Sequence, residues 1–272
     1  MQSFEQKYYE TAEFWKEGMV EDEANTRRLN SSIAILPSDT KTLADIGCGN
    51  GVFAKMLQQQ RPDIDTLSVD RSETALKYVK TKSKVGDIVA LPLEDKTFDC
   101  VTCFEVLEHI PYPVYDTVLN ELTRISKKYV IISVPYQEKT EYNVTKCPAC
   151  HAVFNIVLHL RNYFDKDMQE LLSKFGFRFV KQQLIEKKNK VYLGVDWYIR
   201  FRSGYLRNKG KFRSPICPVC GFENPSFNAT GTDPVNNNHT TAGGGGIKGL
   251  LKKIWPTKYR TGHWVIAVYE RI

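Results

Sequence analysis

The sequence predicts an α/β fold, in which helices cover both faces of a mostly parallel sheet, and three observations support this prediction. Short apolar runs recur along the chain. Amphipathic helical stretches separate the early runs, and such alternation is typical of parallel strands joined by helical crossovers. With 42% hydrophobic and 25% charged residues among 272, the composition is that of a globular protein with a sizeable core.

The order of the elements follows from these runs. The predicted strands are Thr42–Ile46, Thr66–Val69, Phe98–Phe104, Tyr129–Val134, Phe179–Leu184 and His263–Tyr269. The predicted helices are Phe53–Gln60, Thr74–Lys80, Val114–Ser126 and Asp167–Phe175. Residues 1–35 are expected to form an amphipathic helical lid, whose apolar side chains are Phe4, Tyr8, Phe14 and Trp15.

Two segments break the alternation, and we interpret them as inserts. Residues 137–164 separate the strand at Tyr129–Val134 from the helix that follows it. Residues 186–262 separate the last two predicted strands. The second insert includes Asn224–Gly246, a polar, glycine-rich stretch that cannot bury a core and is expected to be a flexible loop.

Charge and the length of the apolar runs limit the location and the partners of the chain. No apolar run approaches the ~18 residues that a membrane span needs. The first thirty residues hold no uninterrupted apolar segment, so the sequence predicts no signal peptide and a cytoplasmic location. A net charge of +7 favours an anionic partner without defining a surface for one.

Residues 42–57, TLADIGCGNGVFAKML, combine a strand, a glycine-rich loop and a helix. Glycines suit a backbone that turns tightly and approaches a ligand closely, and free N–H groups at the start of the helix are hydrogen-bond donors. Tight turns also use glycine for steric reasons alone. Here the next strand ends at Asp70, an acid placed to accept both hydroxyls of a ribose, which favours the ligand interpretation.

The spacing Asp-x-Gly-x-Gly-x-Gly, which begins at Asp45, resembles that of the class I S-adenosylmethionine-dependent methyltransferases and differs from the Gly-x-Gly-x-x-Gly of dinucleotide enzymes. Gly86-Asp87-Ile88 and the strand that begins Phe98-Asp99-Cys100-Val101 fit the same resemblance. It implies a Rossmann-like, seven-stranded, mostly parallel sheet with an antiparallel last strand, which HWVIAVYERI would supply. The insert 186–262 is then the loop of the final hairpin, at the cofactor edge of the sheet.

The resemblance also implies roles for single residues. Asp45 and the glycine loop hold the methionine end of the cofactor, Asp70 holds the ribose, Asp87 reaches the adenine amine and Ile88 covers the adenine face. The full set expected at the cofactor is Asp45, Gly47, Cys48, Gly49, Asn50, Gly51, Asp70, Arg71, Gly86, Asp87, Ile88 and Glu105.

The same resemblance divides the chain. Residues 36–136 form the cofactor-binding half, residues 165–185 add a helix and the sixth strand, and residues 263–272 form the last strand. From the lid, Tyr8, Tyr9 and Trp15 can close over the cofactor, although Trp15 is equally suited to the core.

A cluster of ionisable residues follows the strand that ends at Phe104, in the order Glu105-Val106-Leu107-Glu108-His109. If this segment opens a helix, Glu105, Glu108 and His109 lie at i, i+3 and i+4 on one face. Two carboxylates and an imidazole can bind a divalent cation or act as a general base. A purely structural role, with Glu105 near the cofactor amine and His109 packed in place, is an equal alternative.

A second histidine, His159, precedes a later helix. With it, the Glu-x-x-Glu-His segment looks like two groups of O-methyltransferases, the ubiquinone-pathway enzymes and the small-RNA 3′-terminal 2′-O-methyltransferases. This likeness implies a divalent cation whose ligands are Glu105, Glu108, His109 and His159. Such a metal lowers the pKa of the acceptor hydroxyl and aligns that hydroxyl with the methyl group.

The seven cysteines fall into two classes. Three stand singly in apolar surroundings and are predicted core residues: Cys48, Cys100 and Cys103. The other four form Cys147-Pro-Ala-Cys150 and Cys217-Pro-Val-Cys220, the knuckle pattern of a tetrahedral zinc site. Four thiolates leave no open position, so the expected zinc is structural and joins the two inserts above the cofactor. There are three alternatives: two turns whose cysteines stay reduced and bind no metal, a disulfide within each pair, and a zinc site in which His151 replaces one cysteine.

Basic residues gather in the second insert. One run is interleaved with aromatic residues and comprises Arg200, Arg202, Arg207, Lys209, Lys211 and Arg213. A second stretch, Ile247–Arg260, is amphipathic and suits an anionic membrane surface or a phosphate-bearing substrate. A solvated helix face is the simpler alternative.

These features predict an enzyme that transfers a methyl group from S-adenosylmethionine to a hydroxyl of a small-molecule, glycan or lipid-linked acceptor, with or without a metal. One alternative is an RNA 2′-O-methyltransferase, although no recognised RNA-binding module accompanies the basic insert. Another is an N-methyltransferase that uses His109 without metal. A non-enzymatic cofactor-binding scaffold is the third, since a fold does not fix a function, but the intact glycine loop and ribose acid argue against it.

Overall fold

The computed structural model describes residues 10, 15, 23–138, 140, 144–192, 212, 217–224 and 257–272, and of 186–192 and 257–263 it describes the backbone alone. The chain divides into two compact units. The first, here called the sheet unit, comprises Met1–Glu138, Leu160–Glu186 and His263–Ile272. The second, the insert unit, comprises Lys139–His159 and Lys187–Gly262.

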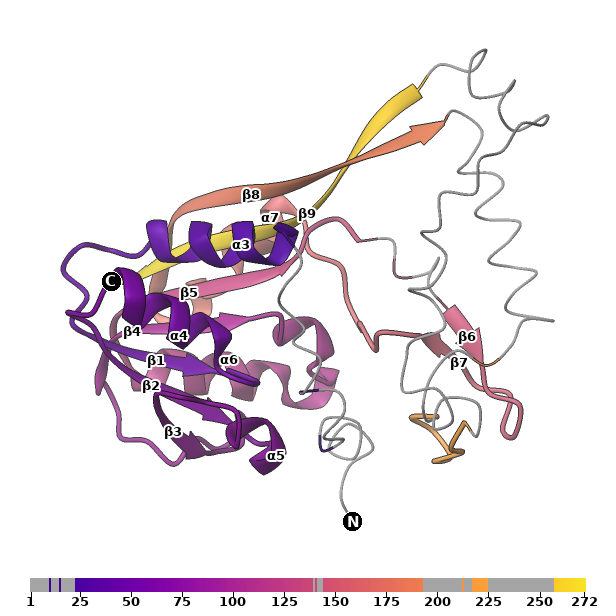
Figure 1. Cartoon of the computed structure of the whole chain (residues 1–272), viewed down its shortest axis with the longest axis horizontal. Helices are drawn as coiled ribbons and strands as arrows, with labels where there is room; N and C mark the ends of the chain where they lie inside the picture. The colour runs from indigo at the N-terminus through magenta and orange to yellow at the C-terminus, as the bar shows by residue number, and fades with distance from the viewer. Residues whose placement is uncertain are drawn as a thin grey trace. The chain divides into compact units, whose positions relative to one another are not determined.

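A seven-stranded sheet forms the centre of the sheet unit (Figure 1). Neighbouring strands from β3 to β5 are parallel, and β9 is antiparallel to β5. The predicted seven-stranded, mostly parallel sheet with an antiparallel last strand is therefore confirmed. In spatial order the strands are β3 (Lys82–Val85), β2 (Asp65–Asp70), β1 (Thr42–Ile46), β4 (Phe98–Phe104), β5 (Ser126–Pro135), β9 (Thr257–Arg271) and β8 (Phe177–Tyr192).

The burial of each strand matches its place in the sheet. β1 and β4 lie in the middle and are buried at nearly every residue, as apolar strands are when helices cover both faces. β3, with the sequence KSKV, is exposed at every residue and lies at one edge. Its lysines oppose pairing of that edge with another chain.

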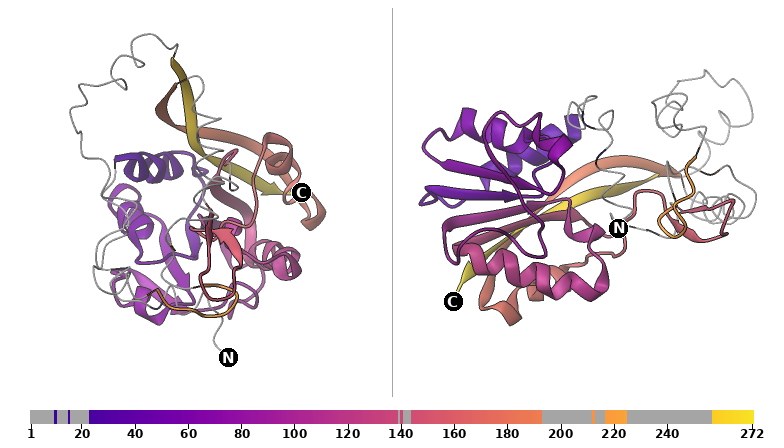
Figure 2. Two further views of the ribbon diagram at one scale, coloured as in Figure 1. Left: turned by 90° about the vertical axis from the view of Figure 1, so that its right-hand side faces the viewer. Right: turned by 90° about the horizontal axis from the view of Figure 1, so that it is seen from below.

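Helices cover the sheet on both sides, as Figure 2 shows. On one side, α3 (Glu23–Ala34) and α4 (Val52–Gln60) pack through Leu29 and Phe53 against Leu43 and other buried side chains of the sheet. The ring of Phe53 contacts that of Phe104 edge to face, with 4.9 Å between the ring centroids.

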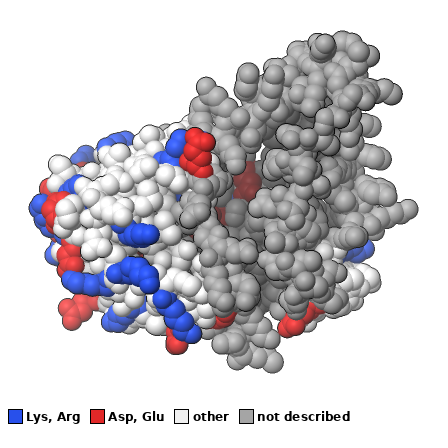
Figure 3. Space-filling view, viewed as in Figure 1, with Lys and Arg blue, Asp and Glu red and all other residues white. Residues whose placement is uncertain are grey.

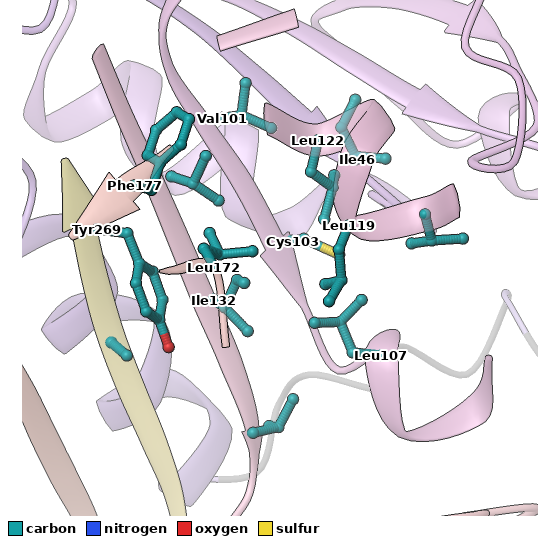
Figure 4. Close-up of a cluster of buried hydrophobic side chains, with 14 of the residues drawn as sticks. Ile46, Val101, Cys103, Leu107, Leu119, Leu122, Ile132, Leu172, Phe177 and Tyr269 are labelled. Atoms are coloured by element: carbon teal, nitrogen blue, oxygen red, sulfur yellow. The ribbon is translucent and has the colours of Figure 1, made fainter. Parts of the chain in front are cut away.

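The larger core lies on the other side of the sheet (Figure 4). It is closed by α6 (Tyr115–Ile125) and α7 (Asp165–Glu170), which contribute Leu122 and Met168. Tyr269 of β9 is fully buried there, and its hydroxyl donates to the carbonyl oxygen of Met168 at 2.6 Å. This bond fastens α7 to the last strand that enters the sheet.

Tyr269→Phe is expected to destabilise the chain by about 1–2 kcal/mol, because it leaves the Met168 carbonyl without its buried donor. The edge-to-face contact between ring 269 and Phe179, at 6.0 Å, is kept by phenylalanine. Urea unfolding followed by tryptophan fluorescence measures the change. An unchanged midpoint would show that water replaces the hydroxyl.

Several elements differ from the sequence prediction. The helix expected at Thr74–Lys80 is one turn, α5 (Glu73–Leu76), capped by the Ser72 hydroxyl and closed by tight backbone bonds from residues 78 and 79. The helix expected at Asp167–Phe175 starts earlier and ends at Glu170, and a 3-10 turn follows at Ser173–Phe175. The insert unit holds an unexpected antiparallel pair, β6 (Val144–Lys146) and β7 (Val153–Asn155).

Several predictions concern residues outside the described ones, namely Phe4, Tyr8, Tyr9, Phe14, the basic run 200–213 except Phe212, and 225–256. Of Ile247–Arg260, residues 257–260 belong to strand β9. None of the helices in the described ranges combines the length and the hydropathy of a membrane span. On the face drawn in Figure 3, basic and acidic side chains both scatter over the described surface.

Candidate active site

The loop between β1 and α4 depends on its glycines. Gly47, Gly49 and Gly51 have φ angles of +76°, +54° and +77°, a region that glycine adopts without steric cost. The N–H groups of Gly47 and Cys48 donate to the carbonyl oxygen of Val69 at 2.8 and 3.1 Å, which fastens the loop to β2. Cys48 and Asn50 are half-buried in this loop. Its backbone therefore lines the carboxyl end of β1 with little side-chain bulk.

Asp70, the last residue of β2, binds the glycine loop from the side. Its Oδ2 accepts the N–H of Gly49 at 2.8 Å, and its Oδ1 accepts the N–H of Ser72 at 2.9 Å. Each carboxylate oxygen retains a lone pair for a ligand hydroxyl. Burial raises the pKa of Asp70, and the two backbone donors lower it. Arg71, next in the chain, is half-buried.

Asp45 lies in β1 and is only 3% exposed. Thr102, its neighbour on β4, donates its hydroxyl to Asp45 Oδ1 at 2.8 Å. Burial raises the pKa of Asp45 to about 7, Thr102 lowers it, and the charge of Asp70 raises it. A buried carboxyl that titrates near neutral pH ionises readily when a cation binds beside it.

The segment after β3 turns back over the sheet at Gly86. The N–H of Gly86 donates to the carbonyl oxygen of Asp70 at 2.9 Å, and a Cβ there would lie 2.9 Å from Pro92 and from Val69. Asp87 is exposed and its Oδ1 accepts the N–H of Val89. Ile88 is half-buried against the core. The predicted adenine segment thus follows β3 directly at the carboxyl edge.

Trp15, a described residue of the N-terminal segment, lies against the glycine loop. It is 7% exposed, and a Cβ at Gly49 would lie 2.8 Å from Cζ3 of its ring. The sequence predicts two possible roles for Trp15, closing over the cofactor as part of the lid or packing in the core. In the structure it is buried and it also touches the loop.

Glu105 is bound by three neighbours at the carboxyl end of β4. The Ser133 hydroxyl donates to its Oε1 at 2.9 Å, and the indole N–H of Trp264 donates to its Oε2 at 2.5 Å. Arg28 of α3 places Nη1 3.9 Å from Oε1, and its guanidinium carbon lies 5.5 Å from the centre of the Trp264 ring. Glu105 itself has φ +57°, which is uncommon for a residue other than glycine.

Sequence reasoning missed these three partners of Glu105. A tryptophan within the otherwise aliphatic strand WVIAV was the available signal for one of them, since a buried indole N–H needs an acceptor. Ser133 and Arg28 gave no comparable signal, because their partner is distant in the sequence.

Trp264→Phe is expected to lower stability by about 1–2 kcal/mol by removing a donor to a carboxylate. Combined with Glu105→Gln in a double-mutant cycle, the two changes are expected to couple by about 1 kcal/mol. Chemical denaturation of the four proteins gives both values. Additive losses would mean that the indole and the carboxylate do not interact in solution.

The cluster Glu105, Glu108 and His109 does not form the expected helical face. Glu105 precedes the turn, and Leu107–His109 is a 3-10 helix. Glu105 lies outside this turn and has a left-handed backbone at φ +57°, so the i, i+3 and i+4 spacing of an α-helix does not hold for the three groups. The prediction of one face was wrong because the chain must turn sharply where β4 ends.

Glu108 is a buried carboxyl, 1% exposed, whose two oxygens have no hydrogen-bond partner among the described residues. Burial raises its pKa well above the ordinary value, and the charge of Glu105 raises it further. His109 is half-buried beside it in the chain. His159 is the last residue of the insert unit, and the next residue, Leu160, donates its N–H to the Glu108 carbonyl oxygen at 2.8 Å.

The predicted core role is confirmed for two of the three single cysteines, and Cys48 is the exception. Cys100 and Cys103 are fully buried in β4, and Cys48 is half-buried in the glycine loop. In the insert unit, the ligand atoms of four others lie within 4.8 Å of one another: Cys147, Cys150, Cys217 and Cys220.

Comparison with known proteins gives a match to a domain model over part of the sheet unit. Residues 44–133 match the model of a methyltransferase domain. An uncharacterized protein of Methanocaldococcus jannaschii is 38% identical over 33% of this chain and 39% of its own length. A ubiquinone biosynthesis O-methyltransferase of Nitrosomonas europaea is 31% identical over 39% of this chain and 48% of its own. The chain spans less than two thirds of the length of these relatives.

Among solved structures, magnesium protoporphyrin IX methyltransferase of Synechocystis, with SAH bound, has the same fold. Its TM-score is 0.52 at 16% identity, with 67% of this chain and 92% of that chain covered. Residues 44–133 of this chain are thus similar to a methyltransferase domain, and they lie in a sheet with the strand order that the sequence resemblance implies.

Proposed function

We propose that this protein binds S-adenosylmethionine at the carboxyl edge of the sheet and transfers its methyl group to a hydroxyl oxygen. The observation that carries the proposal is the placement of three carboxylates on neighbouring strands. Asp45 lies near the end of β1, Asp70 ends β2, and Asp87 follows β3. Ligands of open α/β sheets bind at this edge.

Each carboxylate suits one part of the cofactor. Asp45, buried and with a pKa of about 7, suits the α-ammonium group, since a cation there stabilises the ionised form. Asp70 retains acceptor capacity for the two ribose hydroxyls. The exposed Asp87 and the half-buried Ile88 suit the amine and the face of the adenine. The glycine loop, which carries little side-chain bulk, suits the methionine chain.

The bound cofactor supplies an electrophilic methyl carbon, and the chain must position an acceptor oxygen in line with it and remove a proton. We assign the proton transfer to His109, next to the carboxylates of the 105–109 segment. A general base needs to reach the acceptor proton directly or through one water molecule. Glu105, held by Ser133 and Trp264, is a fixed negative group at the same edge.

A divalent cation held by Glu108 and His109 is the second part of the proposal, and Glu105, whose oxygens accept from Ser133 and Trp264, is not part of this donor set. The donor set fits such an ion, because both Glu108 oxygens are buried and without a hydrogen bond among the described residues. A buried carboxylate is either protonated or paired with a positive charge. Bound there, a cation would lower the pKa of the acceptor hydroxyl.

The acceptor class we favour is a polyhydroxylated aromatic or similar small molecule. The support is the likeness to relatives named as ubiquinone biosynthesis O-methyltransferases, one of which aligns with 39% of this chain. An anionic or lipid-linked acceptor agrees with the net charge of +7.

Calorimetric titration with S-adenosylmethionine tests the cofactor site. We expect micromolar binding by the wild type and a loss of at least tenfold, about 1.4 kcal/mol, in Asp70→Asn. The matched control is Asp99→Asn, because Asp99 accepts the N–H groups of Lys41 and Thr42 near the amino end of β4, away from the carboxyl edge. Equal affinity in all three proteins would exclude the assigned site.

A radiolabelled methyl-transfer assay tests the acceptor. Catechols, primary amines and a short RNA with or without a 2′-hydroxyl serve as acceptors, after chelation and after return of Mg²⁺, Mn²⁺ or Zn²⁺. Transfer to a hydroxyl that depends on His109 supports the proposal. Transfer to amines, or to RNA alone, would overturn the acceptor assignment while leaving cofactor binding intact.

A further inference from the structure

Two turns in the insert unit have the same backbone hydrogen bonds. In the first, Cys147 donates its N–H to the carbonyl of Ala152 and accepts the N–H of His151 at its own carbonyl, at 2.9 and 3.1 Å. In the second, Cys217 makes the same two bonds with Phe222 and Gly221, at 2.9 and 3.0 Å. The two turns are copies of one local structure, and 66 residues separate the two Cys-Pro-x-Cys units.

Each turn also aims backbone N–H groups at sulfur. The N–H of Ala149 lies 3.4 Å from Cys147 Sγ, and the N–H of Val219 lies 3.4 Å from Cys217 Sγ. Donors placed in this way stabilise a thiolate rather than a neutral thiol, because they point their positive ends at the sulfur. Cys147 and Cys217 are fully buried, where a thiolate needs a cation as partner.

The distances between the sulfur atoms fit one tetrahedral ion. Cys147 Sγ lies 3.7 Å from Cys220 Sγ, and Cys150 Sγ lies 3.6 Å from Cys217 Sγ. For a Zn–S bond of about 2.3 Å, the edge of a regular tetrahedron is about 3.8 Å. A disulfide requires about 2.05 Å instead. Both contacts join one turn to the other rather than pairing cysteines within a turn.

The surroundings of the cluster are those of a small folded support. β6 leads into the first turn and β7 leaves it. The ring of Phe212 lies 6.1 Å from that of Phe154 in β7 and 5.7 Å from that of Phe222 after the second turn. The side-chain amide of Asn224 donates to the Phe212 carbonyl at 3.0 Å. Three aromatic rings thus join the same two segments beside the sulfur cluster.

We infer that the four cysteines of the insert unit, Cys147, Cys150, Cys217 and Cys220, bind one structural Zn²⁺ ion. The ion closes a long loop, because it joins Lys139–His159 to the segment that follows Lys187. Four thiolates fill its coordination, so it takes no part in chemistry. Its task is to fold the insert unit, whose glycine-rich and polar sequence holds little core of its own. The inference does not depend on the proposed methyl transfer.

The comparison of the two turns also excludes His151 as a ligand. His151 has φ +62° and occupies the place that Gly221, at φ +73°, holds in the second turn. The position demands a left-handed backbone, which glycine provides without strain. His151 therefore occupies the left-handed position of the turn, directly after Cys150, and the metal does not need its side chain as a ligand.

Elemental analysis of the full chain, purified without an affinity tag and reconstituted in Zn²⁺, tests the site. We expect one zinc per chain in the wild type, less than about a third of that in Cys217→Ser, and an unchanged content in His151→Gly. Cys100→Ser is the control for loss of a buried thiol outside the insert unit. Zinc loss in His151→Gly with retention in Cys217→Ser would overturn the assignment.

Two measurements on the wild type guard against variants that fail to fold. Titration of the metal-free chain with Co²⁺ is expected to give the intense visible bands of tetrahedral thiolate coordination, which excess Zn²⁺ abolishes. Intact-mass analysis of the reduced and unreduced chain is expected to show no disulfide. A mass lower by two or four hydrogens, iron in place of zinc, or no cobalt spectrum would each contradict the inference.

Discussion

Gly47→Ala is expected to destabilise the chain by about 3 kcal/mol and to weaken S-adenosylmethionine binding at least a hundredfold. The added Cβ would lie 2.4 Å from Cγ2 of Val106, closer than atoms can approach, and the residue has φ +76°. Relief requires the loop to move away from β2, which breaks the bonds to the Val69 carbonyl. Urea unfolding and calorimetric titration measure the two effects.

Gly176→Ala is the matched control, because it separates backbone strain from the clash. Gly176 has φ +75°, and a Cβ there meets no atom within 4 Å. Its replacement should therefore cost only the strain of a left-handed alanine, about 1–2 kcal/mol, with cofactor binding unchanged. Adding Val106→Ala to Gly47→Ala removes the clashing methyl group. The double variant should therefore lose only as much stability as Gly176→Ala does. Equal losses at Gly47 and Gly176 would show that the contact with Val106 is unimportant.

Asp45→Asn is expected to stabilise the cofactor-free chain at pH 8 and to weaken cofactor binding at least tenfold. The wild-type carboxyl has a folded-state pKa of about 7 against a reference value of 3.8, because burial disfavours the charge. Below pH 3.8 the carboxyl is protonated in both the folded and the unfolded chain, so it does not change the free energy of unfolding. Between pH 3.8 and about 7 it ionises in the unfolded chain alone, and the folded state loses stability as the pH rises through this range. The loss is about 1.4 kcal/mol per pH unit, so asparagine removes a penalty of a few kcal/mol.

The same carboxyl also sets the pH dependence of cofactor binding. Its ionisation lowers the stability of the cofactor-free chain but strengthens binding of a positive group. A cationic cofactor group prefers ionised Asp45, so affinity should rise as the pH increases toward 7 and then level off. Thr102→Val removes the hydroxyl that lowers this pKa and should move the profile to higher pH. Thermal unfolding at pH 5 and 8, with titration across that range, measures both. A flat binding profile in the wild type would refute the assignment of Asp45 to a positive group.

The sheet was predictable because its central strands are apolar runs that depend on local sequence alone. β3 was not, since KSKV has no apolar residue until Val85 and pairs only because the chain returns beside β2. The glycine loop was found for the opposite reason, as its backbone angles require glycine at three places. Backbone conformations that only certain residues adopt can be predicted from the sequence, because they restrict the residue type at each position.

The network around Glu105 left no such trace. Its donors come from Ser133, Trp264 and Arg28, and each partnership exists only after β4, β5, β9 and α3 have assembled. The 3-10 turn at Leu107–His109 was missed similarly, because the sharp exit from β4 is set by packing rather than by helix propensity. The copied hydrogen bonds of the two cysteine turns, in contrast, could be expected from their shared Cys-Pro-x-Cys pattern.

The place of β9 between β5 and β8 has a consequence for biosynthesis. Its register sets Tyr269 opposite Val130 and Val265 opposite Val134, although β8 leaves the ribosome well before it. Until β9 arrives, β5 presents an open row of backbone donors and acceptors beside buried valines and isoleucines. Open apolar edges recruit other strands and promote aggregation. The nascent chain is therefore prone to aggregation from the synthesis of β5 until that of β9. The second insert lengthens this interval, because it is synthesised before β9. During the interval, the open edge of β5 is a defined strand edge that a chaperone can protect.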